Sequence, residues 1–108
     1  MISNKIHKPE EEEKEKHVPH IEVNGNTVTV KCGRDVQHPS TDQHYIGWIK
    51  LFGVDKQDNF RELGSANLTP VLSHPGASFM VNVGNYKKFL ALIYCNLHGL
   101  WENKLKLE

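Results

Sequence analysis

The stretch "IEVNGNTVTVKC", Ile21 to Cys32, decides the fold class of this chain. Apolar and polar residues alternate on both sides of an Asn-Gly pair, and such a pair between alternating residues is the strongest local signal for a β-hairpin. Side chains that alternate in this way point to opposite faces of a strand, so that one face can be buried. The stretch therefore predicts two short antiparallel strands joined by a tight turn.

Similar patterns recur towards the C-terminus, separated by residues that favour turns. Further strands are predicted at "HYIGWIKLFGV" (44–54), "FRELGSANL" (60–68), "SFMVNV" (78–83), "KKFLALIYC" (87–95) and "WENKLKL" (101–107). The segment 60–68 carries the weakest strand pattern, and no helical periodicity occurs beyond the N-terminal segment. About seven short strands predict an all-β fold, an immunoglobulin-like β-sandwich whose end loops can carry a site.

Length and charge limit the other possibilities. A chain of 108 residues has room for one modest core. Residues 1–14 form a charged segment, expected to be a solvated tail or short helix, and residues 15–108 form the predicted domain. The formal net charge is +0, so a nucleic-acid-binding surface is not expected. No apolar run could span a membrane and no signal peptide is recognisable, so the expected location is the cytoplasm, with no membrane partner.

A cysteine and a histidine stand three residues apart where the most apolar predicted strand ends. They are Cys95 and His98 in "YCNLHGLWE". His38 and His44 bracket the loop "HPSTDQH" directly before another predicted strand. Each of these residues alone could be a packing, capping or surface residue. Together, a thiolate and several imidazoles suit iron, copper, zinc or nickel rather than magnesium or calcium.

Three motifs carry a resemblance to a known family. "EKHVP" (15–19), "HPSTDQHYIGWI" (38–49) and "CNLHGLWE" (95–102) occur in the order typical of superoxide reductases. This family includes the neelaredoxins and the catalytic domain of desulfoferrodoxin. The chain resembles the one-iron class, because a second, rubredoxin-like iron centre needs four cysteines and the chain has two.

The resemblance implies an enzyme that reduces superoxide to hydrogen peroxide without producing oxygen. Its cofactor would be one mononuclear non-haem iron per chain, cycling between Fe2+ and Fe3+. The ligands implied by the motifs are four histidines and one axial cysteine: His17, His38, His44, His98 and Cys95. Glu15 would bind as a sixth ligand in the ferric state, and Lys16 would attract superoxide. The implied partners are a small electron donor such as rubredoxin and further copies of the chain in a homotetramer.

The sequence departs from the family pattern at three places. His20 stands where an aliphatic residue is common, and strand alternation predicts that it lies on the surface. Cys32 has no implied role and is expected to be a buried free thiol. The chain is also shorter than many relatives, mostly between Val54 and Ser78.

Two other functions fit part of the pattern. One is a cupredoxin-like electron carrier, but such a site usually needs an axial methionine after the cysteine-histidine pair, and the only methionines are Met1 and Met80. The other is an immunoglobulin-like binding module with a structural zinc or without a metal. Structural zinc is usually bound by four ligands in a closed site, whereas this sequence offers five candidates.

Overall fold

The computed structural model describes residues 2–9 and 16–108. Each predicted strand segment contains a strand. The elements are η1 (Ile2–Lys5), β1 (Pro19–Asn24), β2 (Thr27–Cys32), β3 (Ile46–Asp55), β4 (Phe60–Asn67), β5 (Gly76–Met80), η3 (Val83–Asn85), β6 (Tyr86–Cys95) and β7 (Gly99–Lys106). The strand predicted at 78–83 begins earlier and ends at Met80, because the backbone N–H of Val83 turns back to the carbonyl of Val81.

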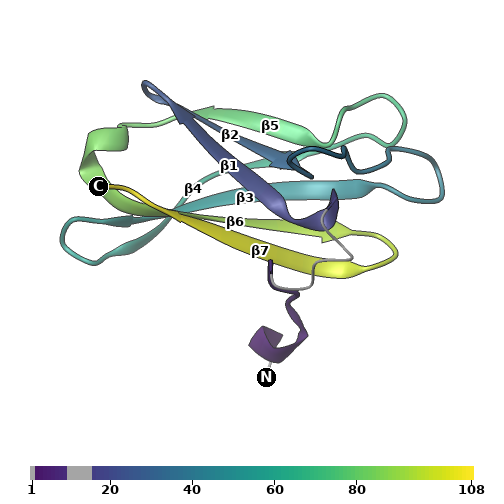
Figure 1. Ribbon diagram of the computed structural model, residues 1–108, viewed down its shortest axis with the longest axis horizontal. Coiled ribbons are helices and arrows are strands. Elements are labelled where there is room, and N and C mark those ends of the chain that lie inside the picture. The colour runs from purple at the N-terminus through teal and green to yellow at the C-terminus, as the bar shows by residue number, and fades with distance from the viewer. Residues whose placement is uncertain (1, 10–15) are drawn as a thin grey trace.

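The strands form two antiparallel sheets. One sheet has the order β1-β2-β5 and the other has the order β4-β3-β6-β7. The two sheets lie over one another as layers (Figure 1), and the predicted all-β sandwich of immunoglobulin type is confirmed. At the predicted hairpin, Asn24 pairs with Thr27, and Gly25 takes a φ of 61°, a conformation that glycine adopts at low cost.

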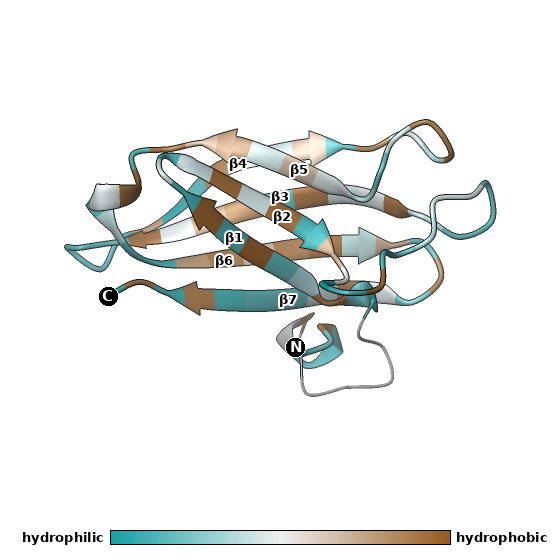
Figure 2. Ribbon diagram, turned by 45° about the horizontal axis from the view of Figure 1, so that its top comes forward, coloured by the Kyte–Doolittle hydropathy of each residue, from teal (hydrophilic) through white to brown (hydrophobic). Residues whose placement is uncertain are grey.

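The core forms where the inner faces of the sheets meet. Bands of hydrophobic and hydrophilic residues alternate along β1 and β2 (Figure 2). The inward positions are filled by the buried residues Ile21, Val28, Val30, Cys32, Ile46, Ile49, Leu51, Phe89, Ala91, Ile93, Cys95 and Trp101. Every second residue of β6 from Phe89 onward is buried, so the alternation places Cys95 in the core at the end of that strand.

The N-terminal segment contacts the edge of β7. Residues 2–5 form a 3-10 helix, and His7 pairs with Trp101 in a parallel bridge. The charged segment, expected to be a solvated tail or short helix, holds this four-residue 3-10 helix within residues 2–9. The predicted domain boundary at 14/15 lies outside the described residues. No helix within 2–9 or 16–108 is long and apolar enough to cross a membrane.

Candidate metal centre

Three separate segments deliver histidine and cysteine side chains to one end of the sandwich. His17 lies two residues before β1, while His38 and His44 lie in the loop that leads to β3. Cys95 ends β6, and His98 lies in the turn to β7. This end is on the right in Figure 1, where β6 passes into β7. Five predicted ligands separated by up to 81 positions in the chain therefore meet in one region.

Four of these residues offer ligand atoms that lie close together. One nitrogen or sulfur atom each from His17, His44, Cys95 and His98 lies within 4.8 Å of the others. The Nε2 atom of His17 lies 2.8 Å from Nδ1 of His98, and Sγ of Cys95 lies 3.8 Å from the same Nδ1. A soft sulfur donor among nitrogen donors is the set that suits a first-row transition metal.

His38 lies at the edge of this group. Its ring centroid lies 4.5 Å from that of His17 and 4.5 Å from that of His44, although its ligand atoms are not among the four that lie within 4.8 Å of one another. The Nδ1–H of His38 donates a hydrogen bond to the carbonyl of Pro39 at 2.7 Å. This bond fixes the ring orientation and leaves Nε2 as the atom that can bind a metal.

Two imidazole nitrogens in the loop that leads to β3 find no hydrogen-bond partner among the described residues. Nε2 of His38 and Nε2 of His44 are buried and find no hydrogen-bond partner among residues 2–9 and 16–108. Buried polar atoms are nearly always hydrogen-bonded, so two such nitrogens in one cluster need an explanation. A metal ion bound by both nitrogens would satisfy them, and the residues present therefore fit a metal.

Burial favours the neutral, metal-binding form of His38 and His44. Burial lowers the pKa of His38 to about 4, against the opposing effect of its bond to Pro39. Burial, together with the nearby His98 and Lys16, also lowers the pKa of His44. A neutral imidazole has a lone pair to donate, so both rings are ready ligands near neutral pH.

Backbone contacts fix the ligand segments relative to one another. The N–H of His38 donates to the carbonyl of Cys32, and the N–H of Gly33 donates to the carbonyl of Val18, each at 3.0 Å. Gly33 has a φ of 86°, and a Cβ atom there would collide with the carbonyl of Val36 and lie 3.0 Å from Cα of Lys16. The close approach of these segments therefore requires glycine at position 33.

Asn96 joins the two loops that carry His44 and His98, a role that sequence reasoning missed. Its Oδ1 accepts a hydrogen bond from the N–H of Tyr45 at 2.8 Å, and its Nδ2 donates to the carbonyl of Gln43 at 3.0 Å. The only signal in the sequence is its place between Cys95 and His98 in the third motif.

Trp101 also supports two predicted ligands, and its role was missed as well. Its indole is fully buried and stacks on His17, with 5.2 Å between the centroids. The Nε1–H donates to the carbonyl of His98 at 3.3 Å. One side chain thus positions residues from the first and the third motif.

Other residues singled out in the sequence are Lys16, Glu15 and His20. Lys16 is half-buried, and its charge contributes to the low pKa of both His38 and His44, which places it beside the cluster. Glu15 lies outside the described residues. His20 is partly exposed on β1, 3.6 Å from a carboxylate oxygen of Glu22, as expected of a residue outside the site.

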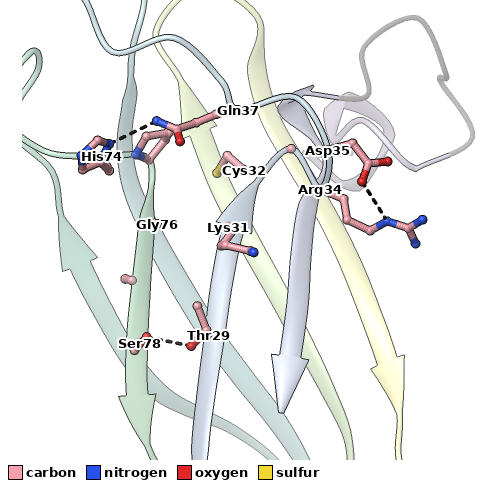
Figure 3. A pocket seen from close by; sticks show the side chains of 12 residues that line it. Thr29, Lys31, Cys32, Arg34, Asp35, Gln37, His74, Gly76 and Ser78 are labelled. Carbon is pink, nitrogen blue, oxygen red and sulfur yellow. Dashed lines mark hydrogen bonds and ion pairs between the residues drawn. The ribbon is translucent and has the colours of Figure 1, made fainter. Parts of the chain in front are cut away.

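Cys32 is the buried free thiol that was predicted. Burial raises its pKa, and the neighbouring Cys95 adds to the effect, so it stays protonated. Cys32 also lines a separate surface pocket of about 510 Å³, formed by the paired strands β2 and β5 and the loops that adjoin them (Figure 3). The polar groups of this pocket bond to one another, for example Gln37 to His74 at 3.2 Å and Thr29 to Ser78 at 2.7 Å. None of the five predicted ligands lines it.

Comparison with known proteins agrees with this geometry. The family model described as Desulfoferrodoxin matches residues 9–104. A superoxide reductase from Pyrococcus horikoshii is 38% identical over 102 residues, covering 87% of this chain and 89% of the relative. A neelaredoxin from Megalodesulfovibrio gigas is 32% identical over 109 residues, covering 82% of this chain and 84% of the relative.

A solved structure supports the same relationship. The one-iron superoxide reductase from Giardia intestinalis superimposes with a TM-score of 0.80 at 49% sequence identity, covering 86% of this chain and 99% of that chain. The family model spans all three motifs, and the relatives match over nearly their full length. The chain therefore belongs to the desulfoferrodoxin family, to which its resemblance to superoxide reductases pointed.

Proposed function

We propose that this protein is a superoxide reductase that uses one mononuclear iron per chain. Superoxide takes up one electron and two protons and leaves as hydrogen peroxide, without the formation of oxygen. The observation that carries the proposal is the meeting of four imidazoles and one thiol at one end of the sandwich. Relatives named superoxide reductase that match along most of the chain support it.

The five residues proposed to hold iron are His17, His38, His44, Cys95 and His98. His38 would bind through Nε2, because its Nδ1–H is bonded to Pro39. His17 and His98 would bind through Nε2 and Nδ1, the two atoms that lie 2.8 Å apart. Iron, when bound, would supply the electron and a coordination position for the substrate. The thiolate of Cys95 adds a soft, electron-rich donor to the histidine nitrogens.

Lys16 and Glu15 are proposed to act on the substrate side of the site. The positive charge of Lys16 contributes to the lowered pKa of His38 and His44. The same charge would attract the superoxide anion and help to organise its protonation. A local cation can raise the rate of encounter even on a protein without net charge. Glu15 is proposed to bind as the sixth ligand in the ferric state, a role carried by the resemblance alone.

The two alternative functions have less support. A cupredoxin-like site would need an axial methionine, yet Met80 is 89% exposed and pairs with Thr27 at the opposite end of β2 from Cys32. A structural zinc bound by the four residues whose ligand atoms lie within 4.8 Å of one another would leave the buried Nε2 of His38 without a partner.

The remaining partners are proposals as well. We infer an electron donor of the rubredoxin kind from the resemblance, and a cytoplasmic location from the sequence. The outer face of the larger sheet supports self-association, because Trp48 and Tyr94 stack across β3 and β6 with 6.0 Å between centroids and remain partly exposed. An aromatic face of this kind suits a second copy of the chain. The homotetramer itself is proposed from the resemblance.

The direct test is the stoichiometry of superoxide consumption by iron-loaded protein supplied with an electron donor. We expect one peroxide for each superoxide and no oxygen, measured by pulse radiolysis with a peroxide assay and an oxygen electrode. Zinc-loaded protein is the matched control and should consume no superoxide. Release of oxygen with half the peroxide would identify a dismutase, and a zinc form as active as the iron form would exclude iron as the redox centre.

A further inference from the structure

His7 contacts the candidate metal centre indirectly, through Trp101. The imidazole of His7 stacks on the indole with 4.4 Å between centroids and an angle of 25° between planes. The same indole stacks on His17 and bonds to the carbonyl of His98. A continuous line of ring contacts therefore runs from the N-terminal segment to a proposed iron ligand.

Backbone and charge contacts hold His7 in this place. Its N–H donates to the carbonyl of Leu100 at 2.8 Å, and its carbonyl accepts from the N–H of Glu102 at 3.0 Å. Lys8 forms an ion pair with the carboxylate of Glu102. This isolated parallel bridge lies at the free edge of β7, beyond which η1 lies in Figure 1.

The position of the indole matters to the centre because it contacts two proposed ligands at once. A shift of Trp101 would move the ring of His17 or the turn that carries His98. The side chains that support metal ligands from behind fix the ligand orientation, and their loss weakens metal binding. Stacked aromatic rings prefer defined offset geometries, so the ring of His7 can restrict the indole.

We propose that His7 is a positioning residue of the metal centre, which holds Trp101 against His17 by ring stacking. The inference rests on the proposed iron site, but it concerns a residue outside the three motifs. The contact that carries this role is made by the plane of the imidazole ring, which stacks on Trp101. Phenylalanine at this position should therefore replace histidine, whereas alanine should not.

The test measures metal affinity and the environment of the indole separately. Co2+ affinity is determined by competition with a chelator for the parent chain, His7→Ala and His7→Phe. We expect His7→Ala to bind Co2+ about tenfold more weakly, at the lower end of the losses seen when supporting residues are removed. His7→Phe should bind within a factor of about two of the parent, because it restores the stacked ring.

The second measurement needs no metal. In a Trp48→Phe background, Trp101 is the sole tryptophan, and its near-ultraviolet circular dichroism in metal-free protein reports the stack. His7→Ala should change this band and His7→Phe should restore it. The matched control is Phe60→Ala, which removes an exposed ring stacked on Phe52, 5.1 Å between centroids, on the β3–β4 hairpin. It should alter neither measurement.

Unchanged Co2+ affinity in His7→Ala would overturn the positioning role, and so would a His7→Phe variant as weak as His7→Ala. If His7→Ala does not fold, His7→Leu takes its place, since it covers the indole without a planar ring. Failure of the parent chain to bind Co2+ would contradict the metal centre itself. The two failures can be told apart, because the positioning role is overturned when the parent chain binds Co2+ normally and His7→Ala binds it equally well.

Discussion

The Nε2 atom of His17 lies 2.8 Å from the Nδ1 atom of His98, although the two residues are 81 positions apart in the chain. Two nitrogen ligands at right angles on one metal, each at a bond length of about 2.1 Å, would be about 3.0 Å apart. The observed separation is thus close to that of two neighbouring ligands on the same ion. The fold itself brings these atoms together, because His17 lies two residues before β1 and His98 lies in the turn between β6 and β7.

The thiolate of Cys95 should be necessary for both colour and activity. Cys95→Ser replaces a soft sulfur by a hard oxygen that cannot give the same charge-transfer band to ferric iron. We expect loss of the visible band and of superoxide reduction, checked by absorption spectroscopy and pulse radiolysis. Cys32→Ala removes the other buried thiol and should keep both properties. A coloured and active Cys95→Ser protein would refute the ligand assignment.

Lys16 should speed the capture of superoxide by its charge. Lys16→Ala is expected to lower the second-order rate about tenfold at low salt and to flatten its dependence on ionic strength, since steering of an anion by a cation is screened by salt. Pulse radiolysis across ionic strength measures this, and iron content should be unchanged. Lys56→Ala, which removes an exposed lysine from the turn between β3 and β4, is the control. An unchanged rate in Lys16→Ala would remove this residue from the mechanism.

Glu15 should be dispensable for the reduction but not for the ferric spectrum. If the carboxylate binds iron only in the ferric state, Glu15→Ala should keep a near-normal second-order rate and alter the visible absorption of the oxidised protein. Glu15→Gln tests whether the charge is needed for that absorption. A collapse of the rate in Glu15→Ala would show a role in the reduction itself.

Gly33 should matter to both stability and metal binding. Gly25→Ala introduces a side chain at a φ of 61° in open space and should cost about 1 kcal/mol of unfolding free energy. Gly33→Ala adds a collision with the carbonyl of Val36 and crowding against Lys16, and should cost about 3 kcal/mol.

Denaturant unfolding compares these two glycine variants, and Co2+ binding is measured in parallel. Only Gly33→Ala should weaken metal binding, because Gly33 contacts the segment that carries His17. Equal losses of stability, with metal binding unaffected in both variants, would contradict the account of Gly33.

Local pattern was sufficient to predict the strands, whereas the candidate ligand group came from the resemblance carried by the three motifs. The Asn-Gly hairpin and the alternation in β6 are properties of neighbouring residues, and the inward place of Cys95 follows from that alternation. The motifs indicated His17, His38 and His44 because their order and spacing are specific. The contacts of Asn96, Trp101 and His7 were not predictable in this way. They join side chains from segments far apart in sequence, and no periodicity marks them.

The central claim is that Cys95 and four histidines bind one redox-active iron. The most direct test is the visible spectrum of protein loaded with ferrous iron without oxygen and then titrated with a mild oxidant. We expect a nearly colourless ferrous form that turns blue as one electron per chain is removed, through a ferric–thiolate charge-transfer band. A protein that binds iron but develops no such band on oxidation would contradict the claim.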